Sequence, residues 1–427
     1  MMKKIMSVLL TGAMVFSLTA CGAAPAADNA PAASTTEAEE ATAEEATTEE
    51  APVEETADAQ NITLKVWGSQ VEQDNLVELC EAFAAEHPEN NWTFEYGVVG
   101  AADAQARYLE DLAAAADVFV YPDDQMISLV EADALYEVTR NADAIVAANT
   151  PGSIDASSYN GTLYGYPMTA DNGYYLYYDK SVLTEEDVKT LDGILEAANA
   201  AGKKVHMDVA NGWYLASFFL GNGCTLSLDA DGKQVCDFNS EAGLAAAEAI
   251  RAFCDNEAFV AGDDTVLQGG IGDSICAGIS GPWTSAAIKE TLGDNYAAAK
   301  LPTFTCNGEQ VQMGSFLGCK ILGVNTQSEH PVEAMDLAEY LTNESSQVIR
   351  FEELGYGPSN INAAASDAVK ADPALSALAE QSKYAISQHV LGQYWTPAQA
   401  FGAELVAHST DDLQTMLDQL VEQTITE

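Results

Sequence analysis

Asn61-Ile-Thr-Leu-Lys-Val-Trp67 and Asp117-Val-Phe-Val-Tyr121 are the two stretches that decide the fold. In the first, Ile62, Leu64 and Val66 alternate with polar residues, which predicts a strand. The second is a short apolar run of the kind that forms a buried strand. Apolar residues at helical spacing lie between them. Strands that alternate with helices in this way favour a doubly wound α/β lobe.

A second α/β set follows from about residue 174, with a strand predicted at 204–209 and a helix at about 241–254. In such sheets, ligands bind outside the carboxyl ends of the strands. In the first set these ends lie near Ser69–Gln70 and Pro122–Gln125, so we expect ligand contacts there.

Composition and charge narrow the class of protein. The chain has 427 residues, 66 Asp and Glu against 17 Lys and Arg, and a formal net charge of −49. Its length suits two domains or one large two-lobed unit, and 48% apolar residues are enough to build a core. Such acidity excludes a nucleic-acid binder, which needs a basic stripe, and it disfavours a polybasic membrane-surface patch.

The N-terminus has the pattern of an export signal. Lys3 and Lys4 precede a largely apolar run at 5–18 that is too short for a transmembrane helix. Leu18-Thr-Ala-Cys21 resembles a bacterial lipobox. We therefore expect a signal peptide at 1–20 and a lipid on Cys21, which becomes the mature N-terminus. The alternative is an ordinary signal peptide with a chance cysteine.

Residues 21–60 are predicted to be a lipidated cysteine followed by a disordered linker. Between 22 and 60 the chain has eleven acidic residues and no basic or aromatic ones. Such a composition cannot bury enough apolar surface to fold. Repulsion between like charges extends the linker, which would hold a folded domain away from an anionic surface.

The chain shows no motif for catalysis, a cofactor or a metal. Its five histidines lack zinc-helix spacing, no Cys-x-x-Cys pair occurs, and nucleophile elbows, Walker A loops and dinucleotide fingerprints are missing. Cys224 and Cys236 flank a hairpin predicted to turn at Asp229–Gly232 and would lie about opposite each other. They are either a disulfide or two buried thiols. We expect no enzyme activity and no cofactor.

Seven motifs follow one another along residues 61–427. They are Leu64-Lys-Val-Trp-Gly68, Asp117-Val-Phe-Val-Tyr121, Tyr159-Asn-Gly-Thr-Leu-Tyr-Gly-Tyr-Pro167, Leu176-Tyr-Tyr-Asp-Lys180, Gly281-Pro-Trp283, Leu301-Pro-Thr-Phe304 and Tyr394-Trp-Thr-Pro397. In this order and spacing, behind the lipobox, they resemble the extracellular solute-binding proteins of sugar ABC importers, in particular the maltose/maltodextrin-binding proteins.

The resemblance implies a periplasmic-binding-protein-like fold, with two α/β lobes that are joined by crossover strands and close on a ligand in the cleft between them. Crossovers near Asp171-Asn-Gly173 and Leu301–Thr305 would serve as hinges. The implied lobe bounds are 61–170 with 306–352 for lobe 1, and 171–305 with 353–427 for lobe 2.

The resemblance also implies binding residues, because a sugar presents apolar faces to aromatic rings and hydroxyls to polar groups. The stacking rings would be Tyr121, Trp213 or Tyr214, Trp283 and Trp395. The hydroxyl-binding groups would be Asp124, Asp171 or Asn172, Asn211 and, in the first lobe, Glu72 and Asp103. Gln73 and Gln125 stand where the family places Lys and Arg, so two basic contacts are missing.

The implied function is that of a monomeric lipoprotein on the extracellular face of the cytoplasmic membrane. It would capture an α-glucan oligosaccharide of the maltose or maltodextrin type and deliver it to an ABC permease. The lipid would be its only membrane contact, and no nucleic acid would be a partner. The alternatives are a binding protein for another oligosaccharide, a surface glycosidase with two carboxylates at a fixed separation, or an adhesive lipoprotein.

Replacement of the lipidated cysteine tests the anchor. The Cys21→Ala variant should be released from the membrane or mislocalised, because it has no acyl chain to insert. Ligand affinity should not change, because the linker separates this residue from the folded domain. Cell fractionation measures the release. A variant that still requires detergent to leave the membrane would contradict the anchor.

Overall fold

The computed structural model describes residues 59–229, 232–388 and 390–426. All of them belong to one unit, Asp58–Glu427. The predicted signal peptide, the predicted lipid site at Cys21 and the predicted linker as far as residue 58 lie outside the described residues.

The first large sheet has five strands in the order β2-β1-β3-β18-β6. β1 runs parallel to β2 and β3, whereas β18 is antiparallel to β3 and β6. The alternation predicted for the first strand is confirmed, because Ile62, Leu64 and Val66 are buried. The strand bounds are β1 Asn61–Gly68, β2 Asn91–Val98, β3 Val118–Pro122, β6 Tyr166–Pro167 and β18 Lys320–Val324.

The second large sheet also has five strands, in the order β12-β9-β13-β8-β14. β9 runs parallel to β12 and β13, and β8 is antiparallel to β13 and β14. Along β8, Tyr175 and Tyr177 face one core and Leu176 and Tyr178 face the other, so this sheet is covered on both faces. The bounds are β8 Tyr175–Asp179, β9 Lys204–His206, β12 Phe259–Val260, β13 Ile275–Ser280 and β14 Tyr296–Ala299.

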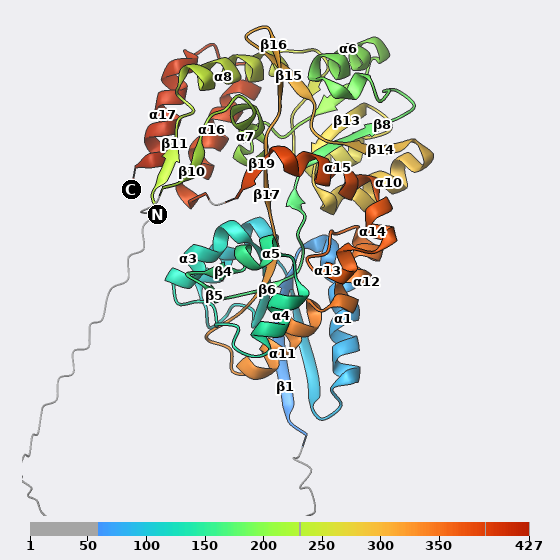
Figure 1. The fold of residues 1–427 in the computed structure, drawn as a ribbon, viewed down its shortest axis with the longest axis vertical. Helices are drawn as coiled ribbons and strands as arrows, with labels where there is room; N and C mark the ends of the chain where they lie inside the picture. The colour runs from blue at the N-terminus through green and yellow to red at the C-terminus, as the bar shows by residue number, and fades with distance from the viewer. Residues whose placement is uncertain (1–58, 230–231, 389, 427) are drawn as a thin grey trace, which may run out of the picture. The chain divides into compact units, whose positions relative to one another are not determined.

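Helices cover both faces of each large sheet, so the predicted doubly wound, two-lobed α/β fold is confirmed (Figure 1). α1 and α11 pack on one face of the first sheet, and α2 and α3 pack on the other. In the second sheet, α7, α8, α16 and α17 lie on one face, and α9, α10 and α15 on the other. The helix bounds are α1 Gln73–Glu86, α2 Ala104–Glu110, α3 Met126–Glu131, α4 Ala142–Ala148, α5 Pro151–Ala156, α6 Leu191–Ala201, α7 Gly212–Gly221, α8 Glu241–Cys254, α9 Asp264–Gly270, α10 Ser285–Leu292, α11 Pro331–Leu341, α12 Glu344–Leu354, α13 Ile361–Ala364, α14 Asp367–Ala371, α15 Pro373–Gln381, α16 Trp395–Val406 and α17 Leu413–Ile425.

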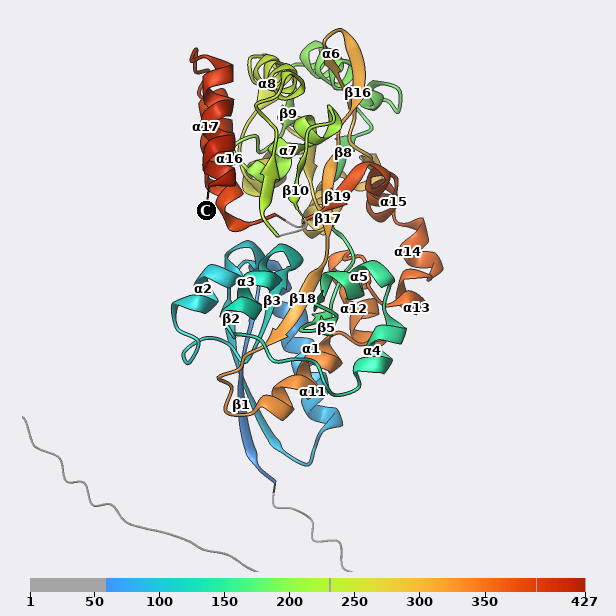
Figure 2. The ribbon, with the colours of Figure 1, turned by 60° about the vertical axis from the view of Figure 1, so that its left-hand side comes forward.

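A small third sheet, β19-β17-β7, connects the two large ones. β7 (Asn172–Gly173) stands between β6 of the first sheet and β8 of the second, at the crossover that the sequence predicts. β17 (Ser315–Gly318) leads into β18 of the first sheet and pairs antiparallel with β7 and parallel with β19 (Ala385–Ser387). Figures 1 and 2 show these strands between the two halves.

The second crossover lies later in the chain than Leu301–Thr305, where it was expected. Phe304, Cys306 and Met313 are buried in the core of the second sheet. Phe304 and Cys306 lie on β15 (Thr303–Cys306), and Met313 follows β16 (Glu309–Gln312), with which β15 forms a hairpin. The apolar side chains of this hairpin hold it in the core of the second sheet. The lobe bounds remain a prediction, and we propose to assign 306–314 to lobe 2.

The hairpin between Cys224 and Cys236 is formed by β10 (Leu226–Leu228) and β11 (Gln234–Cys236). Its register pairs Cys236 with Leu226, so the two cysteines are not directly opposite each other, contrary to the prediction. Both thiols are free and buried, which is the second of the two alternatives. Burial raises the pKa of Cys224 to about 11 and that of Cys236 to about 12, so both are inert at neutral pH. The two other short strands are β4 Ser158–Tyr159 and β5 Thr162–Leu163.

Candidate functional site

The candidate site lies at the carboxyl ends of the parallel strands in both large sheets. β1 and β3 are followed by turns at Gln70–Glu72 and Asp123–Gln125. In the second sheet, β9 leads to Asn211 at the start of α7, and β13 leads to Pro282–Thr284. This edge of a parallel sheet is where ligands bind in open α/β folds, because the connections on either side of it diverge there.

Gln388, which immediately follows β19, links three predicted site residues. Its Nε2 donates a hydrogen bond to Asp124 Oδ1 at 2.9 Å, and its Oε1 accepts bonds from Trp213 Nε1 at 2.9 Å and Asn172 Nδ2 at 3.3 Å. The side chain thus joins the first sheet, a crossover strand and the second sheet. Burial raises the pKa of Asp124, and the Asp123 carboxylate raises it further. Gln388 was missed in the sequence because it belongs to no motif.

Two tryptophan rings adjoin this polar cluster. Trp213 and Trp283 are both half-buried, and their ring centroids lie 5.8 Å apart. Trp283 Nε1 donates to Asp264 Oδ2 at 2.7 Å, which fixes the indole orientation. The ring folds back over Gly281, where a Cβ atom would lie 2.1 Å from it. A glycine at position 281 is therefore a steric requirement of this turn.

The third predicted tryptophan lies beside the crossover. Trp395 begins α16, is half-buried, and lies 6.3 Å from the ring of Phe316 on β17. Its neighbour Tyr394 is fully buried and donates a hydrogen bond to the Gly212 carbonyl at 2.8 Å. The bond from Tyr394 ties the start of α16 to the start of α7, one residue from Trp213.

Glu72 and Asp171 belong to a buried charged cluster with Lys320, Arg350 and Tyr356. Glu72 Oε2 accepts hydrogen bonds from the Ser69 backbone and hydroxyl at 2.8 and 2.6 Å. Burial would raise the pKa of Glu72, but Lys320, Ser69 and Arg350 outweigh burial and hold this pKa below its usual value. Burial raises the pKa of Asp171, although Lys320 opposes the shift.

One feature of the sequence distinguishes Lys320. It is a lone charged residue within the apolar stretch of β18, and it lies opposite Pro122 at the end of β3. A lysine in a strand that is buried throughout needs a partner or a function.

The structure does not place every predicted residue at a surface that a ligand could reach. Tyr121 is fully buried in a core with Phe119, so the prediction that it stacks on a ligand is wrong for this structure. The reason is its register: in β3, residues 119 and 121 face the core under α2 and α3. Of the predicted pair, Tyr214 is buried in the core and Trp213 is half-buried, so we retain Trp213.

Of three further polar candidates, two have local hydrogen-bonding roles in the structure. Asn211 is exposed and caps α7, with its Oδ1 accepting from the Trp213 backbone N–H at 3.0 Å. Asp103 is exposed in the turn Ala101–Asp103. Asp171 accepts a hydrogen bond from the Gly357 backbone N–H, which fastens the first crossover to the segment after α12.

The two glutamines that replace family basic residues bind the backbone. Gln73 Nε2 donates to the Gly68 and Ser69 carbonyls at 2.9 and 3.2 Å. Gln125 Nε2 donates to the Ala102 carbonyl at 2.8 Å. Both amides hold turns at the sheet edge, and their donors are occupied.

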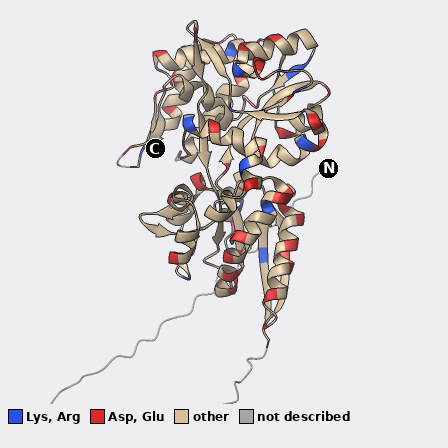
Figure 3. Ribbon diagram, turned by 45° about the vertical axis from the view of Figure 1, so that its right-hand side comes forward, with Lys and Arg blue, Asp and Glu red and all other residues tan. Residues whose placement is uncertain are grey.

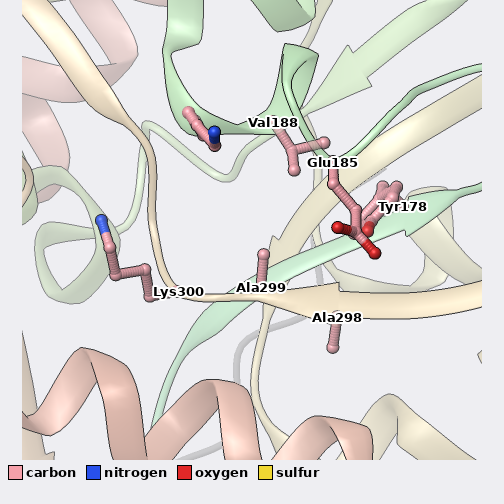
Figure 4. Close-up of a pocket in the computed structure, with 7 residues that line it drawn as sticks. Tyr178, Glu185, Val188, Ala298, Ala299 and Lys300 are labelled. Carbon is pink, nitrogen blue, oxygen red and sulfur yellow. The ribbon is translucent and has the colours of Figure 1, made fainter.

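A cavity of about 320 Å³ is lined by none of these residues (Figure 4). Its lining residues are Tyr178, Glu185, Val188, Lys189, Ala298, Ala299 and Lys300. In the described ranges, no three His, Cys, Asp or Glu side chains are grouped to hold a metal ion. Within the same ranges, no helix has the length and apolarity needed to cross a bilayer.

Two α/β sheets with polar and aromatic side chains at their facing carboxyl edges, joined by crossover strands, define a two-lobed ligand-binding protein. The model of the bacterial extracellular solute-binding protein family matches residues 78–377, and the chain belongs to this family. It is therefore an extracellular binding protein, and the expectation that it is not an enzyme is confirmed by this membership. No curated protein matches the chain.

Solved structures give the same class. One complex with acarbose has a TM-score of 0.77 and 30% identity, over 86% of this chain and 99% of its own. The unliganded maltodextrin-binding protein MalE1 from L. casei BL23 has a TM-score of 0.72 and 27% identity. This match covers 86% of this chain and 100% of the MalE1 chain. The Thermus thermophilus maltotriose-binding protein, bound to maltotriose, shares the fold at a TM-score of 0.73 and 20% identity. This match covers 84% of this chain and 98% of the Thermus chain.

The buried carboxyl of Asp123 predicts a pH-dependent stability. Burial raises its pKa from 3.8 to about 7, so the folded state binds more protons than the unfolded state between these values. Stability contributed by the neutral form is fully present below pH 3.8 and is lost as the pH rises through 7. The Asp123→Asn variant stays neutral, and its Oδ1 can still accept the bond from the Cys319 backbone N–H. The urea midpoint of the variant minus that of the wild type should therefore be larger at pH 8 than at pH 4. An unchanged difference across this range would contradict the argument.

Proposed function

We propose that this protein captures α-glucan oligosaccharides of the maltodextrin type and delivers them to the permease of an ABC importer. The observation that carries the proposal is the convergence of Trp213 and Trp283 with Asp124, Asn172 and Gln388. Flat rings suit the apolar faces of pyranose sugars, and the carboxylate and amides suit their hydroxyls. Neighbours at 27–30% identity, one of them a maltodextrin-binding protein and one in complex with acarbose, support the same ligand class.

Closure of the lobes on the ligand would be a population shift. The polar cluster draws on residues from both large sheets and from β7, so a ligand that contacts all of them favours the closed form. We further propose that the protein acts as a monomer and is held at the outer face of the cytoplasmic membrane by a lipid on Cys21. The lipobox and the extracellular family support this location.

Calorimetric titration of purified residues 61–427 with a glycan panel tests the function. Micromolar or tighter binding of maltotriose with no product formed would support it. Binding of a different glycan alone would move the protein to another sugar, and cleavage of the glycan would contradict a pure binding role.

Removal of the proposed stacking rings should weaken the binding of maltotriose. Trp283→Ala and Trp395→Ala should each cost about 1–3 kcal/mol of binding free energy, as aromatic hot-spot residues do. Trp92→Ala is a matched control, because Trp92 is also half-buried but lies on β2, where it packs on Phe94 of the same strand and on Phe83 of α1. Calorimetry gives the affinities, and circular dichroism checks the fold. Unchanged affinity in both site variants would show that the rings do not stack on the ligand.

Chain length should decide affinity. Gln73 and Gln125 give their donors to the backbone, so a disaccharide has few strong contacts. Hydrogen bonds to charged groups are worth about 1.5–3 kcal/mol, against about 1 for neutral ones. A longer glucan recovers affinity on Trp213, Trp283 and Trp395. We expect maltotriose or longer chains to bind at least about tenfold more tightly than maltose, which is about 1.4 kcal/mol. Titrations from maltose to maltopentaose measure this, and equal affinities would contradict it.

A further inference from the structure

Lys320 is a buried cation in a strongly acidic protein. Asp and Glu far outnumber Lys and Arg along the described chain (Figure 3). Among the described residues, the buried Lys and Arg side chains are Lys320, 7% exposed, and Arg350, 4% exposed. Lys320 is the first residue of β18 and pairs with Pro122 at the end of β3. It therefore lies at the sheet edge where the candidate site is found.

The Lys320 ammonium faces groups from both halves of the fold. Nζ lies 3.9 Å from Glu72 Oε1, 4.2 Å from the ring centroid of Tyr356 and 5.5 Å from that of Trp283. Aromatic faces attract cations at such distances. Glu72 and Lys320 come from the edge of the first sheet, whereas Trp283 comes from the edge of the second.

Two buried polar atoms, on side chains that contact this ammonium, have no hydrogen-bond partner in the structure. They are Glu72 Oε1 and the Tyr356 hydroxyl, on side chains 5% and 2% exposed. The 3.9 Å between Lys320 Nζ and Glu72 Oε1 is too long for a direct hydrogen bond. Buried polar groups in native proteins are almost always hydrogen-bonded, so an additional atom is expected here.

The chemistry of the gap defines that atom. An ammonium can only donate hydrogen bonds, and a carboxylate can only accept them. The missing atom must therefore accept a hydrogen bond from Lys320 and donate one to Glu72. An aliphatic hydroxyl does both at once, whereas a ligand carboxylate or ammonium can do only one of the two. A water molecule also does both, so the test must separate a ligand hydroxyl from water.

We propose that Lys320 and Glu72 jointly bind one hydroxyl of the ligand, on the sugar ring that contacts Trp283. The proposal rests on the proposed function, because it requires a polyhydroxylated ligand. A sugar ring that contacts Trp283 lies next to the ammonium, so Lys320 selects for the position of a hydroxyl on that ring.

Substitution of Lys320 tests the proposal. Lys320→Met removes the donor and keeps the apolar stem, and it should weaken the binding of maltotriose about tenfold or more by calorimetry. Lys320→Gln keeps a neutral hydrogen-bond donor and should therefore lose less affinity for maltotriose. It provides the test if the Lys320→Met variant does not fold. The Lys320→Met, Glu72→Gln double variant should bind little worse than Lys320→Met alone, because both residues hold the same hydroxyl.

Lys300→Met is the matched control. Lys300 is also partly buried beside a tyrosine ring, 5.5 Å from that of Tyr384, but it borders the cavity of Figure 4. Its variant should bind maltotriose as wild type does. Wild-type affinity in Lys320→Met would overturn the proposal.

Monodeoxy analogues of maltotriose separate a ligand hydroxyl from a bridging water. For wild type, one analogue should bind much more weakly than the parent sugar, and Lys320→Met should lose this discrimination. Equal weakening of all analogues by the substitution would indicate water or a structural role and would overturn the proposal. If wild type binds cellotriose or xylotriose instead, and Lys320→Met weakens that binding, the α-glucan assignment fails and the Lys320 role stands. If wild type binds no glycan, both the proposed function and the proposed role of Lys320 are wrong.

Discussion

The pairing of β7 with β17 is the constraint on which the rest of the structure depends. Only two residue pairs, Leu317 with Gly173 and Gly318 with Asn172, set the register between the two main crossovers. At Gly173 a Cβ atom would lie 2.8 Å from the Leu378 side chain of α15 and 3.0 Å from the Leu317 side chain of β17, so a larger residue would not fit beside this pairing. β19 then pairs with the other side of β17. This arrangement brings Asn172 and Gln388 together at the boundary of the two large sheets.

The charged cluster at the same boundary is costly to bury. Desolvation of two carboxylates and two bases is repaid only by well-formed hydrogen bonds, and buried ion pairs are often no more stable than apolar replacements. Here Glu72 Oε1 and the Tyr356 hydroxyl are unpaired, so the cluster is incomplete as a stabilising device. A polar arrangement that is costly and incomplete without a ligand suits a binding site, because the ligand can supply the remaining bonds.

The tryptophans at the site are held before any ligand arrives. The indole N–H of Trp283 is bonded to Asp264, and that of Trp213 to Gln388. Asp264 also accepts from the Ser280 hydroxyl at 2.6 Å, so its carboxylate is itself fixed. A preoriented ring loses little side-chain entropy on binding, which raises the affinity gained from each contact. The binding function therefore depends on polar residues that stand behind the rings.

The sequence by itself determined the elements that carry a clear pattern, because periodicity is local: the alternation at Ile62, Leu64 and Val66 needs no distant partner. It also determined the family, through motifs at fixed spacing. Tertiary structure alone decided which face of β3 Tyr121 occupies, since both faces of the sheet are covered and alternation cannot tell one core from the other. It placed the second crossover at β17 and selected Trp213 over Tyr214. It also joined Gln388 to Asp124 across 264 positions and set Lys320 against Trp283. These contacts depend on how the crossover strands pair, and that pairing is a long-range property that no local pattern carries.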